Sequence, residues 1–588
     1  MFCHLVIAQN DINFKWWSPA EHGSQVIEGQ AWFDELASPY DRLPKRLVNQ
    51  VAPHIWELSK HSAGLMIRFR SNAEEIRIRY KINDENAMNM VHMPTTGVSG
   101  LDLYAINSDG MEVWCGTQTL IFGDTVTYVF PNLNANDGYH DRGREYRLYL
   151  PLYNQITWMR IGVAEDSYFD PLPLRKERPI VVYGTSIAQG ACASRPGMAW
   201  TSILGRKMDR PLINLGFSGS GTFDMPLIDL ISEIDAKIYV LDCLPNLSSY
   251  NWKNLEIENV QELKERISLG IMTLRRRQPL VPILLVDHPG YAQAMVNEKK
   301  RVEFSQVNQV QQQVFYELKQ KGMENIFYLT KEEIGLKMDD TVDGLHPTDM
   351  GMMKYATSCE KILRTVLKEP TGISLTTFPI TQYREPGNYD WENRHREILV
   401  LNQSNNPPKS VFFANSIIHF WGGLPQTKLR VEQTSWDKFF TPLGLRNYAC
   451  GWDRIENLLW RLYHGELDGF EAEKVIIMIG TNNLHLNTDE QILEGLQFLV
   501  EAIKTRQPKA EITLMGLLPR RDYESRIKIL NLQIAELASK AAILFKDLGH
   551  VFLNEENKIN EEFFSDGLHP NAVGYLKLRE EVKPLLMD

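Results

Sequence analysis

The 588-residue sequence predicts an α/β protein in which an N-terminal β-sandwich precedes two similar three-layer α/β/α domains. Three observations predict this class. Apolar residues alternate with polar ones between about residues 60 and 165, apolar runs separated by amphipathic helices fill the remainder, and the string DGLHP occurs at 343–347 and again at 566–570. Alternation is typical of half-buried strands, and continuous apolar runs are typical of buried parallel strands. A string that recurs at a fixed spacing indicates a duplicated unit.

The β-sandwich is expected at 21–170. Its clearest strand has Ile76, Ile78, Tyr80 and Ile82 in alternation with Arg77, Arg79 and Lys81. A second run alternates Leu65, Ile67 and Phe69 with Met66, Arg68 and Arg70. Further short runs with turn residues between them follow up to about 165, as in antiparallel sheets with one face toward water.

The first α/β domain is expected at 171–372. Its buried strands are predicted at 180–186, 212–217, 238–243 and 282–287, with helices such as 259–277 between them. Right-handed crossovers then place helices on both faces of a parallel sheet.

A linker and a second α/β domain are expected at 373–588. Strands are predicted at 411–416, 445–450, 474–480 and 512–519. The second DGLHP lies 223 positions after the first, and Ser416 lies 230 positions after Ser186. The order of strands therefore repeats together with the motif, which excludes a chance recurrence of five letters.

Composition limits the partners and the compartment. A net charge of −11 gives no general attraction to phosphate backbones, so we expect no nucleic acid, and no apolar stretch is long enough to predict a membrane span. Residues 1–20 begin with MFCHLVIAQ, which resembles the remainder of a secretory leader, although an ordinary first strand is the alternative. We therefore expect a periplasmic or secreted protein.

The six cysteines show no CxxC spacing. Cys192 and Cys243 follow two strands of the first α/β domain, so a disulfide between them is conceivable, but two unpaired thiols are the expected state.

Residues with chemical potential follow the predicted strands of the first α/β domain. They are Ser186, Gly219, Asn246, Asp343 and His346. Open parallel sheets bind ligands at the carboxyl ends of their strands. A serine can attack an ester carbonyl when a histidine takes its proton and a carboxylate orients that histidine, while a backbone N–H and an Asn amide stabilise the oxyanion.

The spacing of DGLHP suits this chemistry. We expect Pro347 at the first position of a helix, with His346 at its cap and Asp343 close enough to orient the imidazole. A zinc site would need a third ligand that no recognisable spacing supplies, so no zinc is predicted.

Four segments of the first domain, YGTSI, NLGFSGSG, LDCLPN and VDGLHP, resemble in order the sequence blocks of the SGNH (GDSL-like) hydrolase family. This resemblance implies a flavodoxin-like sheet and serine esterase chemistry without a metal or an organic cofactor. It also implies Ser186 as nucleophile, His346 as base, Asp343 as orienting residue, and an oxyanion hole from the N–H groups of Ser186 and Gly219 with the Asn246 side chain. The preceding sandwich, with GLDLY at 100–104, looks like the accessory N-terminal domain of a bacterial subgroup.

The second domain is similar to the subgroup that includes the α subunits of platelet-activating-factor acetylhydrolase. The segments WENRHREIL, ENLLWRLYHGELDGF and IIMIGTNNLH carry this resemblance together with TRQPKAEITLMGLLPR and DGLHPNAVGY. It implies equivalent roles for Ser416, Asn482, Asp566 and His569.

The second domain departs from the pattern in two places. Ala414 and Asn415 replace the first two residues of the GDS triplet, and Trp452 stands where the oxyanion glycine is expected. A bulky residue at that turn can obstruct the oxyanion hole, so both an esterase and a structural or binding remnant stay open for this domain.

These features favour an esterase that removes acetyl or similar acyl groups from a carbohydrate. An acylated small molecule or glycan is then the expected substrate. The alternatives are a lipid or phospholipid acyl-ester hydrolase and a non-catalytic glycan-binding protein on the same scaffold, since one fold serves many chemistries.

Overall fold

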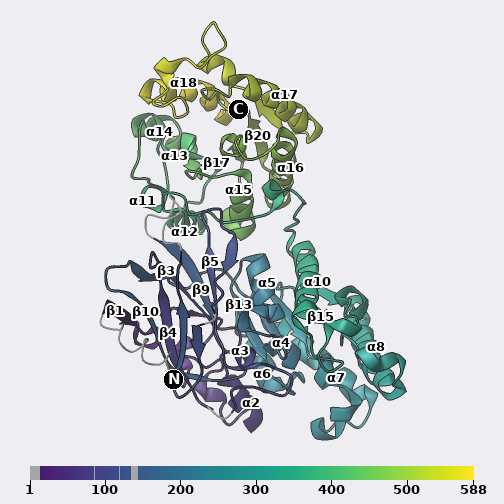
Figure 1. Ribbon diagram of the computed structural model, residues 1–588. Helices are drawn as coiled ribbons and strands as arrows, with labels where there is room; N and C mark the ends of the chain where they lie inside the picture. The colour runs from purple at the N-terminus through teal and green to yellow at the C-terminus, as the bar shows by residue number, and fades with distance from the viewer. Residues whose placement is uncertain (1–12, 85–86, 118, 134–142, 588) are drawn as a thin grey trace. The chain divides into compact units, whose positions relative to one another are not determined.

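The computed structural model describes residues 13–84, 87–117, 119–133 and 143–587 (Figure 1). This part of the chain forms two compact units, one made of most residues up to Leu367 and the other of Lys368 onward together with Ile106–Met111. The mixed α/β class with N-terminal sheets, predicted from the sequence, is confirmed. Among the described residues, we find no helix with the length and apolar character that crossing a membrane requires.

The N-terminal part is a sandwich of two sheets. One sheet has the order β1 (Phe14–Trp17), β10 (Ile156–Ala164), β4 (Ile76–Ile82), β8 (Val126–Phe130) and β7 (Thr119–Ile121). The other has the order β11 (Phe169–Pro171), β3 (Met66–Ser71), β9 (Arg144–Tyr149), β5 (Asp102–Ile106) and β6 (Glu112–Trp114), with β2 (Ile27–Glu28) paired to β3. Between residue 13 and residue 100, the described segments contain the short α-helices α2 (Pro53–Ser59) and α3 (Thr95–Val98).

The core of the sandwich contains the apolar halves of the alternating strands. Ile67 and Phe69 from β3 pack in one cluster with Ile76, Ile78 and Tyr80 from β4. This arrangement follows from the strand period of two, because every second side chain points to the same face.

The N-terminal boundary differs from the expected one at residue 21. Strand β1 begins at Phe14 and pairs antiparallel with β10 over four residues. The ladder to β10 therefore fixes residues 14–17 in the sandwich, whereas residues 1–12 of the expected leader lie outside the described part of the chain.

The arginine face of β3 does not face water, contrary to expectation. Arg68 is 3% exposed and pairs with Glu145 at 2.9 Å. Arg147, its cross-strand neighbour on β9, contacts Asp209 of the first α/β domain at 2.9 Å. Buried charges persist where ion pairs and hydrogen bonds compensate their lost hydration, and here these pairs join the sheet to the neighbouring domain.

The first α/β domain contains a five-stranded parallel sheet. Its order is β13 (Leu212–Gly216), β12 (Ile180–Gly184), β14 (Ile238–Asp242), β15 (Ile283–Val286) and β16 (Ile326–Leu329). The helices are α4 (Ser186–Gln189), α5 (Trp200–Met208), α6 (Met225–Ile231), α7 (Val260–Arg277), α8 (Glu298–Gln320), α9 (Lys331–Ile334) and α10 (Asp349–Leu367). Side chains of β12 alternate between two cores, Val181 and Tyr183 toward α6–α8 and Ile180 and Val182 toward α5 and α10.

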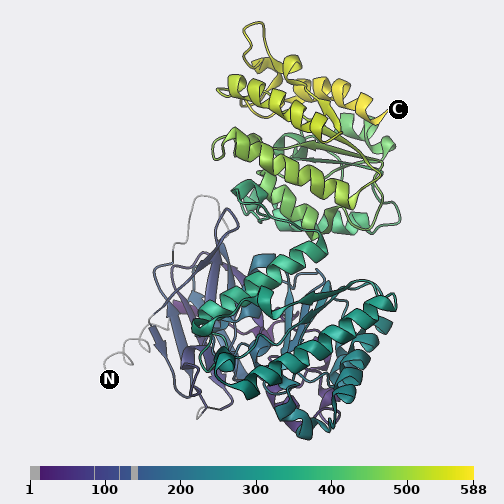
Figure 2. The same ribbon diagram turned by 90° about the vertical axis from the view of Figure 1, so that its right-hand side faces the viewer.

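The second α/β domain repeats this plan (Figure 2). Its sheet has the order β18 (Leu445–Asn447), β17 (Ser410–Ala414), β19 (Lys474–Met478), β20 (Glu511–Met515) and β21 (Leu544–Lys546). The helices are α11 (Pro386–Tyr389), α12 (Trp391–Asn402), α13 (Ser416–His419), α14 (Gln433–Phe439), α15 (Ile455–Arg461), α16 (Asp489–Arg506), α17 (Glu524–Lys540) and α18 (Ala572–Val582). The edge strands β16 and β21 were not predicted, because neither is a continuous buried apolar run.

Cys192 and Cys243 are both free thiols, as are the other three cysteines in the described part of the chain. The expected unpaired state therefore holds in the structure.

Candidate active sites

Three predicted residues of the first α/β domain lie in hydrogen-bond contact. Ser186 follows β12, and its Oγ lies 2.8 Å from His346 Nε2. His346 Nδ1 lies 2.7 Å from Asp343 Oδ2. Both distances are those of ordinary hydrogen bonds, so a proton can pass from the hydroxyl to the imidazole while the carboxylate fixes the ring.

A tight turn before α10 holds Asp343 and His346. Asp343 Oδ1 accepts hydrogen bonds from the N–H groups of Leu345 (3.0 Å) and His346 (2.8 Å), and the Val342 N–H donates to the His346 carbonyl at 2.8 Å. A short Asp side chain favours such a turn because it bonds its own backbone two and three residues on.

The expected position of Pro347 was wrong. Helix α10 begins at Asp349, and Pro347 pairs with Thr341 in an isolated antiparallel bridge. Asp343 and His346 are therefore fixed by the turn and the bridge that closes it, rather than by a helix cap.

The hydrogen bonds within this turn also stabilise the charge on Asp343. Partial burial raises the pKa of Asp343, but the hydrogen bonds from the His346 side chain and N–H outweigh it, so the pKa lies below its usual value. The carboxylate is therefore ionised at neutral pH and can balance an imidazolium.

Gly219 and Asn246 lie in the loops that follow the two strands flanking β12. Gly219 has a φ of +73°, a conformation that favours glycine, and a Cβ there would meet no atom within 4 Å. Asn246 Oδ1 accepts a hydrogen bond from the Gly221 N–H at 3.0 Å. This bond orients the side chain and leaves the donor end of the amide available for a substrate oxygen.

The second domain contains the same triad geometry. Ser416 Oγ lies 2.8 Å from His569 Nε2, and His569 Nδ1 lies 2.7 Å from Asp566 Oδ2. Asp566 Oδ1 accepts from the N–H groups of Leu568 and His569, as Asp343 does in the first domain. The hydrogen bonds from His569 likewise outweigh the effect of burial and lower the pKa of Asp566.

The altered GDS triplet of the second domain keeps its local structure. Asn415 Oδ1 accepts a hydrogen bond from the Ile417 N–H at 3.0 Å, and Thr185 Oγ1 accepts from the Ile187 N–H at 3.3 Å. Each residue caps the short helix that begins with the serine. Thr185 and Asn415 therefore supply the side-chain oxygen that this cap needs.

Trp452 occupies the position of Gly219. It has a φ of +63°, and it lies in the loop after β18, the neighbour of the serine strand β17. Asn482 donates from Nδ2 to the Asp453 carbonyl at 3.0 Å, which places the amide against the same loop. The second domain therefore has an N–H and an Asn amide beside its serine, and in addition a tryptophan side chain.

Sequence reasoning missed a hydrogen-bond acceptor three residues after each serine. Gln189 Oε1 accepts from the Ser218 N–H at 3.0 Å, and His419 Nδ1 accepts from the Gly451 N–H at 2.9 Å. Ser218 and Gly451 immediately precede Gly219 and Trp452. The spacing of 230 residues that relates Ser186 to Ser416 also relates Gln189 to His419, so this pair was detectable from the repeat.

It also missed a buried arginine that holds the end of the strand next to the serine strand. Arg42 Nη1 donates to the carbonyls of Asn214 (3.2 Å) and Gly216 (2.8 Å). In the second domain, Arg394 donates to the carbonyls of Asn447 (2.7 Å) and Ala449 (2.6 Å). Arg42 precedes the first α/β domain by far more residues than Arg394 precedes the second sheet, so no period in the sequence relates the two.

Two further features lie near or beyond the triads. Burial, reinforced by the charge of Asp343, raises the pKa of the Cys192 thiol to about 12, so this cysteine stays protonated near the first triad.

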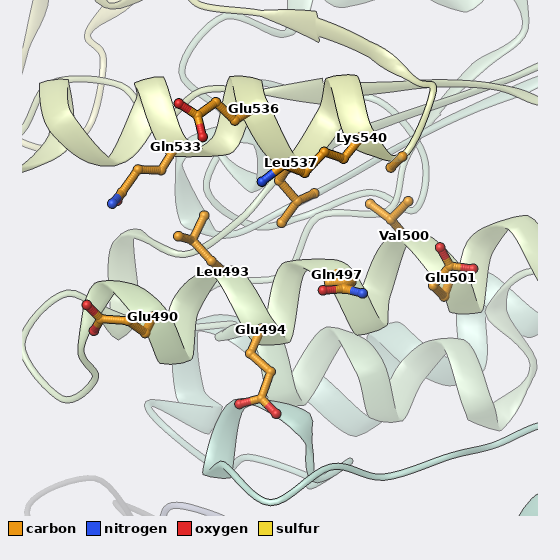
Figure 3. A pocket seen from close by; sticks show the side chains of 11 residues that line it. Glu490, Leu493, Glu494, Gln497, Val500, Glu501, Gln533, Glu536, Leu537 and Lys540 are labelled. Carbon is orange, nitrogen blue, oxygen red and sulfur yellow. The ribbon is translucent and has the colours of Figure 1, made fainter.

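A groove of about 550 Å³ lies between α16 and α17, lined by Leu493, Val500 and Leu537 among several glutamates (Figure 3). No triad residue borders this groove, so it contributes nothing to either triad.

Within the described ranges, no cluster of three or more His, Cys, Asp or Glu side chains is arranged to bind a metal ion.

Three family models match successive parts of the chain. Residues 14–169 match the N-terminus of Esterase_SGNH_hydro-type proteins, the GxDLY domain. Residues 177–364 and 415–577 each match a GDSL-like Lipase/Acylhydrolase family. The resemblances predicted from the sequence blocks are thereby confirmed.

Curated relatives match the second domain. Platelet-activating factor acetylhydrolase IB subunit alpha2 of Rattus norvegicus is 29% identical over 207 residues, which are 34% of this chain and 86% of the relative. The alpha1 subunit of Homo sapiens is also 29% identical over 207 residues, 34% of this chain and 84% of the relative.

A crystal structure of a GDSL-like lipase from Bacteroides ovatus is similar to a larger part of the chain. It covers 60% of this chain and 98% of its own length, with 28% identity and a TM-score of 0.53.

Proposed function

This chain belongs to the GDSL-like lipase/acylhydrolase family through both of its α/β domains, and on that premise we propose that it hydrolyses carboxylic esters at two serine centres. The observation that carries the proposal is the unbroken Ser–His–Asp contact in each domain, with 2.8 Å and 2.7 Å separations at both places.

In the first centre, Ser186 Oγ attacks the ester carbonyl while His346 Nε2 takes its proton. Asp343 holds the ring by Nδ1 and balances the imidazolium charge. The N–H groups of Ser186 and Gly219 and the amide of Asn246 stabilise the oxyanion. His346 then protonates the leaving alcohol, and a water activated by the same ring hydrolyses the acyl-enzyme.

In the second centre, Ser416, His569 and Asp566 take the same roles. The oxyanion is stabilised by the N–H groups of Ser416 and Trp452 and by the amide of Asn482. The caps at Asn415 and the retained backbone conformation at Trp452 support activity here, because they keep the serine and the donor in the places they have in the first domain.

We propose an acetyl group as the acyl part and a carbohydrate hydroxyl as the alcohol. The acetyl group is supported by the relatives that match the second domain, which are named acetylhydrolases. The partial exposure of the triad histidines, 24% for His346 and 20% for His569, supports a large polar alcohol, because the leaving oxygen beside the histidine can then belong to a glycan that stays in solvent. We further propose an exported enzyme, as expected for one that acts on glycans.

A lipid ester is the competing substrate, because the same relatives are named for a lipid mediator.

Turnover of 4-nitrophenyl acetate tests the chemistry. We expect Ser186→Ala and Ser416→Ala each to remove one component of the rate, and the double variant to fall at least about 10⁴-fold, since each triad loses its nucleophile. Ser202→Ala, a buried serine of α5 outside both centres, is the matched control.

A double variant that retained wild-type turnover would refute both nucleophiles. Acetate released from acetylated glycans, compared with acetate released from an acetylated ether phospholipid by the same variants, then separates the two substrate classes. A protein that binds glycans but releases no acetate from either would be a binding protein.

A further inference from the structure

We propose that Trp452 determines the length of the acyl chain that the second centre accepts, so that one chain carries two centres of the same chemistry and different acyl specificity. This inference rests on the proposed ester hydrolysis at Ser416.

The backbone of Trp452 matches that of Gly219. The φ angles are +63° and +73°, and the preceding N–H is held in each domain by the side chain three residues after the serine. The donor N–H of Trp452 therefore has the environment of the donor N–H of Gly219, and the substitution changes the side chain alone.

Several contacts hold this conformation, which is costly for a residue with a Cβ by about 1–2 kcal/mol. The Asp453 carboxylate accepts from Trp391 Nε1 at 2.7 Å and from Arg461 at 2.6 Å, and Gln382 donates to the Gly451 carbonyl at 3.0 Å. Backbone strain that surrounding contacts maintain is characteristic of functional sites.

The Trp452 side chain fills space that is open in the first centre. A Cβ at Gly219 would have no neighbour within 4 Å, and the similar φ of Trp452 directs its Cβ into the corresponding space. The indole is joined through Cβ to the Cα that carries the donor nitrogen, so it is within reach of a carbonyl that this nitrogen binds.

Other aromatic side chains border the second centre. Tyr389 lies against the oxyanion loop, where a Cβ on Gly451 would come within 2.0 Å of its ring, and it stacks on Phe420 with centroids 5.8 Å apart. The Phe420 ring lies 5.0 Å from the His569 ring. Aromatic rings therefore lie beside the triad histidine as well as against the oxyanion loop of the second centre.

The geometry of the tetrahedral intermediate points to the acyl chain as the group that Trp452 limits. Its carbon carries Ser416 Oγ, the oxyanion beside the Trp452 N–H, the leaving oxygen and the acyl chain. The leaving oxygen must lie beside His569 Nε2 to be protonated, which leaves the acyl chain to extend past the oxyanion loop. A wall there rejects long chains because they would have to displace packed atoms.

Single-site proteins, in which either Ser186 or Ser416 is replaced by alanine so that one centre stays intact, test the inference. Their substrates are 4-nitrophenyl acetate, butyrate and octanoate. In the Ser186→Ala protein, where only the second centre works, we expect kcat/KM to fall at least tenfold from acetate to octanoate. Trp452→Gly in that background is expected to raise the octanoate-to-acetate ratio at least tenfold, and Trp452→Phe to give an intermediate ratio.

The reciprocal change is made at the first centre in the Ser416→Ala protein. Gly219→Trp should lower the octanoate-to-acetate ratio there, whereas Gly219→Ala, which carries the backbone strain without the ring, should lower both rates and leave the ratio unchanged. The measurement on the Gly219 variants does not depend on whether any Trp452 variant folds.

The outcomes separate the inference from the proposed function. A Ser186→Ala protein that turns over no ester, and whose Ser416 resists a fluorophosphonate probe, would overturn both. An active Ser186→Ala protein whose ratio is unchanged by Trp452→Gly would overturn only the inference. So would a ratio that changes with the size of the alcohol in a series of acetate esters and not with the acyl chain.

Discussion

At the scale of single residues, the loop that carries each proposed oxyanion donor is held by a side chain outside the triad. Gln189 and His419 differ chemically, yet each accepts a hydrogen bond from the residue before the donor. An amide oxygen and an unprotonated ring nitrogen are interchangeable in this role because both present a lone pair to an N–H. Burial, reinforced by Arg394 and Arg461, holds the pKa of His419 well below its usual value, so the ring stays neutral and can accept.

We predict that His419→Ala in the Ser186→Ala protein lowers kcat about tenfold or more with little change in KM. Loosening a donor should lower kcat less than removing one, because the removal of a whole oxyanion donor lowers kcat about 10²–10³-fold. His419→Gln, which introduces the residue of the first domain, should recover most of the rate. Steady-state kinetics with 4-nitrophenyl acetate measure both.

Gln189→Ala in the Ser416→Ala protein is the matched change at the first centre. If His419→Gln were as impaired as His419→Ala, the packing of the ring rather than its lone pair would be the important property.

At the scale of elements, the helix after each triad Asp–His turn packs closely against the backbone just before that turn. Gly351 and Gly574 lie in the first turns of α10 and α18, at positions 223 residues apart. A Cβ on Gly351 would come within 2.1 Å of the Asp340 carbonyl, and one on Gly574 within 2.2 Å of the Phe563 carbonyl. Both atoms belong to backbone, so neither contact can be relieved by rotating a side chain.

We predict that Gly351→Ala lowers kcat at the first centre and Gly574→Ala at the second, each by about tenfold or more. The helix must move away from the turn, and a displacement of 1 Å at a catalytic group costs up to about 10²-fold. The measurement is kcat of the two single-site proteins with and without the change.

Gly205→Ala on α5 is the control, because a Cβ there makes only an ordinary contact of 3.5 Å with Leu212. Unchanged kcat in both glycine variants would show that the helices do not position the turns.

At the scale of the whole molecule, the chain contains two compact units with separate cores, so a change in one core is expected to affect the stability of that unit.

Asp242, at the end of β14, belongs to the first unit and is completely buried. Tyr355 donates to its Oδ1 at 2.8 Å, but its Oδ2 has no hydrogen-bond partner. Burial, only partly offset by this bond, raises the pKa of Asp242 to about 7.

The sign of the resulting pH dependence follows from proton uptake. Between about pH 4 and pH 7 the carboxyl is ionised in the unfolded chain and protonated in the folded one, so the folded state binds the additional proton. The first unit therefore loses stability as pH rises through this range, by roughly 4 kcal/mol at most for a shift of this size.

We predict that Asp242→Asn, which cannot ionise, gains stability relative to wild type between pH 5 and pH 8. Scanning calorimetry should show two unfolding transitions, and the variant should shift only the transition of the first unit, with a larger upward shift at pH 8. An equal effect at both pH values, or a shift of both transitions, would contradict this account.

Much of this protein was determined by its sequence alone. The order of strands, the duplicated unit and the residues that form each triad follow from local patterns, since strand periodicity and the DGLHP spacing are properties of neighbouring residues. The edge strands and the true start of α10 were not predicted, because a three- or four-residue strand and a two-residue shift of a helix leave little trace in composition.

The tertiary structure alone decided how each oxyanion loop is held. Arg42 reaches Asn214 across 172 positions and Arg394 reaches Asn447 across 53, so the same support comes from different parts of the chain in the two domains. It also decided that Trp452 keeps a backbone conformation that favours glycine. Such features depend on which distant segments meet in the folded chain, and hydrogen bonds between them have no fixed spacing that a sequence can display.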